Sequence, residues 1–63
     1  MQNKYDQLGR DGKVAAHDKA RKMSISEAWD SIDFWRSAGY TPCARRQLHI
    51  AQATLEIKTG AAA

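Results

Sequence analysis

The sequence predicts a mainly α-helical fold, in which two helices form a hairpin, a short extended segment or strand precedes it, and two chains assemble as an intertwined homodimer. Two observations predict the hairpin: residues 24–39 and 41–60 both carry helix start and stop signals, and both place apolar residues at helical spacing. A third observation predicts the dimer. The chain has only 63 residues, and a domain of this size buries only about 60% of its unfolded surface, so a second subunit is one way to complete its core.

The N-terminal third is predicted to be the least regular part of the chain. Residues 1–12 are interpreted as a flexible basic arm, because "LGRDGK" places two glycines around Arg10 and Asp11, which is typical of turns. Residues 13–24 are expected to hold an extended segment or short strand, since "ARKMSIS" alternates, while "KVAAHDKARKM" also has the composition of a third helix. The domain is predicted to span residues 13–60, with residues 61–63 as a disordered tail.

The first helix of the hairpin is predicted to begin at "SISE". Ser24 can cap the first backbone amides while Glu27 reaches back to Ser24, which is the capping-box pattern. Gly39 supplies the stop signal. One face of this helix is apolar and is expected to pack inward; its residues are Ile25, Ala28, Trp29, Ile32 and Trp35.

The second helix is predicted to begin after Thr41, which can cap it, with Pro42 at the first helical position. It is expected to run to about Lys58, where a basic residue suits the helix dipole, and to stop at Gly60. The connection that follows Gly39 is short. The two helices are therefore expected to form either an antiparallel hairpin or an angled helix-turn-helix.

Both helices carry a second apolar surface. On the second helix, residues 44, 48, 51 and 55 can face the first helix, whereas another apolar line lies about 100–150° away. On the first helix, one aromatic ring lies about 150° from the centre of the inward face. We therefore predict an interface for a second copy or a partner protein, made of Phe34, Trp35, Cys43, Ile50 and Ile57. The competing interpretation is a third helix over residues 13–22 that covers Phe34 within one chain.

The chain has few residues suited to catalysis or metal binding. A single cysteine excludes an intrachain disulfide and is typical of intracellular proteins. Cys43, His17 and His49 together fall short of the four ligands of a structural zinc site. On a helix, His49 lies about 240° around from Cys43, which keeps a base away from the thiol. We therefore expect no enzymatic activity, no metal and no cofactor.

Nucleic-acid binding is the alternative function. The net charge of +3 lies entirely in residues 1–23, and the second helix begins like a reading helix. The side chains near its start that suit base edges are Arg45, Arg46, Gln47 and His49. Against this function, acidic residues at positions 27, 30 and 33 of the first helix would repel phosphate. A helix-turn-helix-like DNA-binding regulator, using the second helix and the basic arm, is the alternative to protein binding.

The segment "SISEAWDSIDFWRSAGYTPCARRQLHIAQATLE", with a polar basic arm before it and a total length of 63 residues, resembles the small early lytic-development proteins of lambda-like temperate phages. Those proteins are encoded between the exonuclease and excisionase genes. The resemblance implies an early accessory protein that shifts infection toward lysis, built as a helical dimer with a small strand contribution and without enzymatic activity. Its partner would be an unidentified host or phage protein.

The longest apolar runs, such as "VAA", are far below the ~18 residues of a membrane span, so the protein is expected in the host bacterial cytoplasm and not at a membrane.

Overall fold

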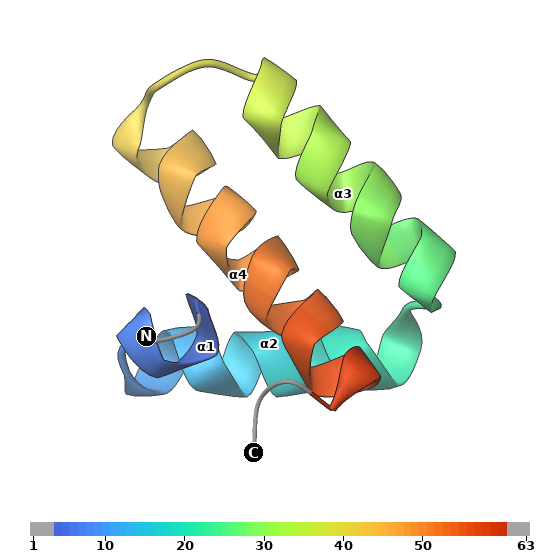
Figure 1. Cartoon of the computed structure of the whole chain (residues 1–63). Coiled ribbons are helices and arrows are strands. Elements are labelled where there is room, and N and C mark those ends of the chain that lie inside the picture. The colour runs from blue at the N-terminus through green and yellow to red at the C-terminus, as the bar shows by residue number, and fades with distance from the viewer. Residues whose placement is uncertain (1–3, 61–63) are drawn as a thin grey trace.

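The computed structural model describes residues 4–60, which form four helices (Figure 1). The helices are α1 (Lys4–Gln7), α2 (Arg10–Lys22), α3 (Ile25–Ser37) and α4 (Pro42–Thr59). The prediction of a mainly α-helical fold is confirmed. Over this range the structure contains no β-strand.

Local capping explains why α3 and α4 begin where the sequence predicts. At α3, the Glu27 backbone N–H donates to Ser24 Oγ (3.1 Å) and the Ser24 N–H donates to the Glu27 carboxylate (3.0 Å). The Ser24 N–H bond lowers the pKa of Glu27. At α4, the Ala44 N–H donates to Thr41 Oγ1 (3.2 Å), and Gly60 ends the helix with a φ of 81°, which glycine adopts without strain.

The extended segment predicted within residues 13–24 is wrong, because α2 occupies it up to Lys22. Only Met23 and Ser24, which link α2 to α3, have extended backbone conformations. The residues of α2 are mostly good helix formers, and Asp18 forms ion pairs with Arg21 (3.2 Å) and Lys22 (3.1 Å) along one side of the helix. The alternation in "ARKMSIS" therefore marks the end of one helix and the cap of the next.

Helices also replace the loose arm predicted for residues 1–12, over the part of it that lies within the described range. The backbone N–H groups of Lys4 and Tyr5 donate to the Glu56 carboxylate at 3.0 and 2.8 Å, so a side chain of α4 caps the start of α1. Gly12 lies inside α2 and not in a turn: a Cβ there would come within 3.1 Å of Leu8, which packs on it. Residues 1–3 of the predicted arm and the predicted tail at 61–63 lie outside the described residues.

Helix α4 is the centre of the fold, since each of the other three helices packs against it. Helix α3 lies beside it on one side, while α1 and α2 cover the other side of its C-terminal half (Figure 1). Small side chains let α2 and α4 approach closely: Ala16, Ala53 and Thr54 are all fully buried. The hydroxyl of Thr54 donates to the Ile50 carbonyl (2.8 Å) and lies 3.5 Å from the Ala16 carbonyl.

The end of α2 is also secured by α4. The Lys58 ammonium group donates to the Ala20 carbonyl at 2.9 Å, in the last turn of α2, where carbonyls lack helical partners and the dipole favours a cation. Two side chains from the last two turns of α4 therefore bond to backbone groups of the N-terminal helices: Glu56 at the start of α1 and Lys58 at the end of α2.

Candidate interaction surface

The residues predicted to form one interface do not share one surface. Ile50 is 3% exposed and forms a core cluster with Ala16 of α2 and Ala53 of α4. Ile57 packs against this cluster and is partly buried. The expectation that both isoleucines face a second chain is corrected, because α2 covers them within the same chain. The alanine side chains of α2 are small, so they give the helix only a weak apolar pattern in the sequence. They nevertheless let α2 and α4 approach closely, and this approach buries Ile50.

The competing interpretation of a third helix is therefore right about the helix and wrong about what it covers. Phe34 remains 63% exposed. Its ring lies 4.9 Å from that of Trp35, centroid to centroid, in an edge-to-face arrangement at 79°. Trp35 is partly buried, and Cys43 is exposed at the start of α4. Of the five residues predicted to form the interface, three therefore remain at the surface: Phe34, Trp35 and Cys43.

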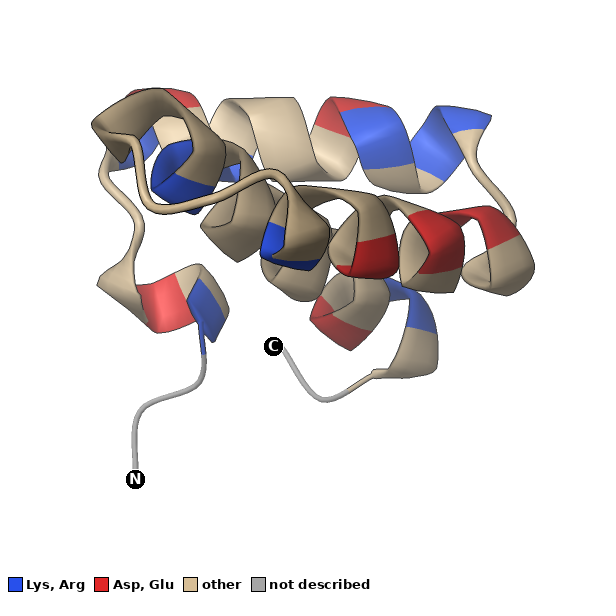
Figure 2. Ribbon diagram, turned by 90° about the horizontal axis from the view of Figure 1, so that it is seen from above, with Lys and Arg blue, Asp and Glu red and all other residues tan. Residues whose placement is uncertain are grey.

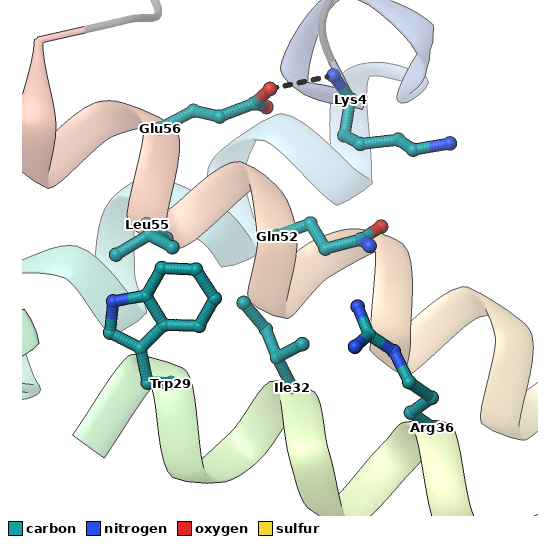
Figure 3. Close-up of a pocket in the computed structure, with 7 residues that line it drawn as sticks. All are labelled: Lys4, Trp29, Ile32, Arg36, Gln52, Leu55 and Glu56. Carbon is teal, nitrogen blue, oxygen red and sulfur yellow. Dashed lines mark hydrogen bonds between the residues drawn. The ribbon is translucent and has the colours of Figure 1, made fainter. Parts of the chain in front are cut away.

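A hollow of about 250 Å³ lies between α3 and α4 (Figure 3). From α3 it receives Trp29, Ile32 and Arg36; the remaining lining residues are Gln52, Leu55 and Glu56 of α4 and Lys4 of α1. Ile32 is 2% exposed and forms its floor, whereas Trp29 is 52% exposed. The inward stripe of α3 is centred on Ala28 and Ile32, so Trp29, about 80° to the side, rests over the edge of α4.

A second hollow adjoins the first, because Arg36 lines both. Its other lining residues are Trp35, Gly39, Tyr40, Arg45, Leu48 and His49. Tyr40 is 95% exposed and stands in the connection between α3 and α4. We refer to the two hollows together as the α3/α4 groove. The groove has aromatic rings along its length and cationic side chains at its edges.

The cations that line the groove form no ion pairs within the described range. Among residues 4–60, the side chains of Lys4, Arg36 and Arg45 form no ion pair. The carboxylate of Glu56 lines the first hollow but accepts the two amide hydrogen bonds from the start of α1. Partial burial, with the positive charges of Lys4 and Arg45, lowers the pKa of His49 below its usual 6.5. Within residues 4–60, three cations therefore line the groove against one carboxylate, that of Glu56.

The floor of the groove also holds an unsatisfied acceptor. Gln52 Oε1 is buried and accepts no hydrogen bond from the described residues. Figure 3 shows its side chain beside Arg36, whose guanidinium points into the space between the helices. A buried acceptor without a donor costs about 1–3 kcal/mol, so a small rearrangement that supplies a donor would be favourable.

The residues predicted to read DNA point in different directions. Arg45 and Arg46 are exposed, and Gln47 and His49 are partly buried. Because successive side chains of a helix diverge by about 100°, Arg45 and Gln47 point to nearly opposite sides of α4. Figure 2 shows acidic positions along α3, which are Glu27, Asp30 and Asp33.

The groove was not predicted from the sequence. Trp29 was expected to face inward, and neither Arg36 nor Gln52 was among the candidate site residues. One signal was present: Arg36 lies seven residues after Trp29 and four after Ile32, which places a cation in the apolar stripe of α3.

No match to this chain was found among protein-family models, curated proteins or solved structures. In the part of the chain that the structure describes, no three His, Cys, Asp or Glu side chains gather where they could hold a metal ion. None of the helices in the described range combines the length and apolar character that crossing a bilayer requires.

Proposed function

We propose that this chain is a non-enzymatic accessory protein that acts by binding another protein through the α3/α4 groove. The observation that carries this proposal is a hollow in which the half-exposed Trp29 and Arg36, which forms no ion pair among residues 4–60, flank the buried Ile32 (Figure 3). Tryptophan and arginine are the residue types that most often dominate binding energy at protein interfaces, and they do so beside well-packed apolar contacts.

The biological setting that we propose comes from the resemblance to early lytic-development proteins of lambda-like phages. In that setting the partner is a host or phage protein of the bacterial cytoplasm, and its capture favours lysis. A helical hairpin of α3 and α4 is the binding element of this proposal, with α1 and α2 as its support.

Self-association is a further part of this proposal. The homodimer would use Phe34, Trp35 and Cys43, because α2 covers Ile50 and Ile57 in the single chain. A surface-exposed ring next to a second ring gives two copies an apolar contact around a two-fold axis. Light scattering on Phe34→Asp should show a monomer with unchanged helix content, and a wild-type protein that stays monomeric when concentrated would contradict this contact.

The groove is tested by crosslinking in cells that express the wild-type chain or Trp29→Ala. A partner that binds in the groove should be crosslinked to the wild-type chain and lost from the variant, since the truncation removes the largest exposed side chain of the site. Val14→Ala is the matched control, because Val14 is 63% exposed on α2 and does not line the groove. Equal recovery of the partner with Trp29→Ala and Val14→Ala would reject the groove as the binding site.

DNA binding is the second candidate function. Arg45 and Arg46 favour it, because both are exposed near the start of α4 and neither forms an ion pair among residues 4–60. A mobility-shift assay across salt concentrations separates the two functions. DNA binding predicts a steep loss of affinity with salt and a loss of the shift in the double variant Arg45→Ala/Arg46→Ala.

A further inference from the structure

The charge and shape of the α3/α4 groove specify the chemistry of its occupant. We propose that the groove binds a short acidic segment of a partner protein, which places an apolar side chain against Trp29 and Leu55 and a carboxylate against Arg36. This inference rests on the proposed protein-binding function and adds the class of partner that the site selects.

The apolar part of the groove suits a side chain better than an enclosed small molecule. The hollow beside Trp29 has a volume of about 250 Å³, below the roughly 300–1,000 Å³ of most small-molecule pockets. Ile32 closes its floor, and Leu55 and Trp29 form apolar walls that remain partly accessible. One or two apolar side chains of a peptide would fill this space and remove the exposed part of Trp29 from water.

The polar part of the groove selects negative charge. Arg36 lines both hollows, Lys4 lines the first and Arg45 lines the second. Among the described residues that line the groove, these three cations face a single carboxylate, that of Glu56, so an excess of positive charge remains. A guanidinium accepts a carboxylate through two parallel hydrogen bonds, so a Glu or Asp of the partner can pair with Arg36 in a defined orientation.

A polyanion such as a nucleic acid is a poorer fit to the same cations. The exposed Glu27, Asp30 and Asp33 lie along α3, which also forms one wall of the groove (Figure 2). A phosphate backbone long enough to cross the groove would approach these carboxylates, whereas a short segment with one or two carboxylates need not. The apolar hollow between the cations also has no counterpart in phosphate recognition.

A library of short random peptides, displayed and selected on the immobilised wild-type chain, tests this inference without assuming a partner. The selected peptides should combine an excess of Asp and Glu with at least one large apolar residue. Their affinity for Arg36→Gln should fall about tenfold, as expected for the loss of one charge-assisted hydrogen-bonded pair. Arg46→Gln is the matched control, since Arg46 is exposed on α4 but does not line the groove.

The fluorescence of Trp29 reports the site directly, as the part of the wild-type emission change that is absent in Trp29→Phe. Selected peptides should change its emission, and high salt should weaken their binding. Peptides with no excess of carboxylates, whose binding requires Trp29 but is insensitive to Arg36→Gln, would overturn the acidic preference and leave the protein-binding function intact. A selection in which no peptide depends on Trp29 would overturn both. A DNA duplex that displaces the peptides from wild-type but not from Arg36→Gln would replace the inference with nucleic-acid binding in the groove.

Discussion

Truncating Ile50 to alanine is expected to destabilise this fold strongly, because Ile50 joins α4 to α2 in the core. Ile50 is 3% exposed and packs with the fully buried Ala16 and Ala53. The substitution removes about three CH₂ equivalents, each worth about 0.8 kcal/mol on burial. The rigid backbones of two closely packed helices cannot collapse into the space left behind, so a cavity penalty is added. The expected loss in the free energy of unfolding is about 3–4 kcal/mol.

That loss is large relative to the stability of the whole domain. A chain of 63 residues has an expected free energy of unfolding of roughly 3–9 kcal/mol. Ile50→Ala is therefore expected to remove at least about a third of this stability. Ile50→Val, which removes a single methylene, provides a folded variant with an expected loss of about 1 kcal/mol.

Urea denaturation, followed by circular dichroism and tryptophan fluorescence, measures these losses. Val14→Ala on the exposed side of α2 is the control and should change the free energy of unfolding by less than about 0.5 kcal/mol. The loss in Ile50→Val should not depend on protein concentration, because α2 of the same chain covers the side chain. The reasoning is refuted if Ile50→Ala costs less than about 1 kcal/mol, or if the loss grows as the protein is concentrated, which would place Ile50 between two chains.

Three further predictions concern caps and charges. Ser24→Ala removes the capping box of α3 and should cost about 1 kcal/mol, which lowers the melting temperature by about 4–8 °C in a domain of this size. Glu56→Ala removes the acceptor that caps α1, so hydrogen exchange at the amides of Lys4 and Tyr5 should accelerate while exchange in α3 is unchanged. The pKa of His49 is lowered in the folded chain, so as the pH falls below 6.5 the unfolded chain takes up a proton first. The free energy of unfolding should therefore fall below pH 6.5, and it should fall less in His49→Gln. Thermal melts across this pH range measure both.

Each of these predictions has a control and a contradicting result. Ser26→Ala keeps the capping box. An equal loss of stability in both serine variants would show that the capping box does not stabilise α3. Asp33→Ala removes an exposed carboxylate of α3 without touching α1, and should leave the Lys4 and Tyr5 amides protected. If wild type and His49→Gln lose the same stability between about pH 7 and pH 5, proton uptake at His49 does not contribute.

The elements that sequence reasoning predicted correctly are those whose signals are local. The capping box joins Ser24 to Glu27, three residues apart, and Thr41 caps the amide of Ala44 at the same spacing. Such bonds form wherever the helix forms, so the chain segment alone is enough to identify them. The N-terminal helices were harder to predict, and α2 was only the alternative to an extended segment, because their signals were ambiguous. Gly12 suggested a turn, but in α2 its missing Cβ makes room for Leu8.

The prediction that Ile50 and Ile57 face a second chain failed for a related reason. The two apolar sides of α4 were correctly identified, and the small size of the chain correctly implied that a second side needed a cover. Which segment provides that cover depends on how α2 is placed, and the closeness of Ala16 to Thr54, 38 residues away, is not visible as a hydrophobic pattern. An alanine side chain buries little apolar area, so its contribution where two helices cross is to let the two backbones approach closely.

The sequence by itself determined that this protein is helical, where α3 and α4 begin and end, and that α4 is apolar on two sides, because capping and helical periodicity act over a few residues. Only the tertiary structure decided that α1 and α2 cover Ile50, that Glu56 caps a helix 52 residues earlier in the chain, and that Trp29, Arg36 and Gln52 meet in one groove. Those contacts depend on the angles at which helices cross. The angles follow from the fit of whole surfaces and not from any short run of residues.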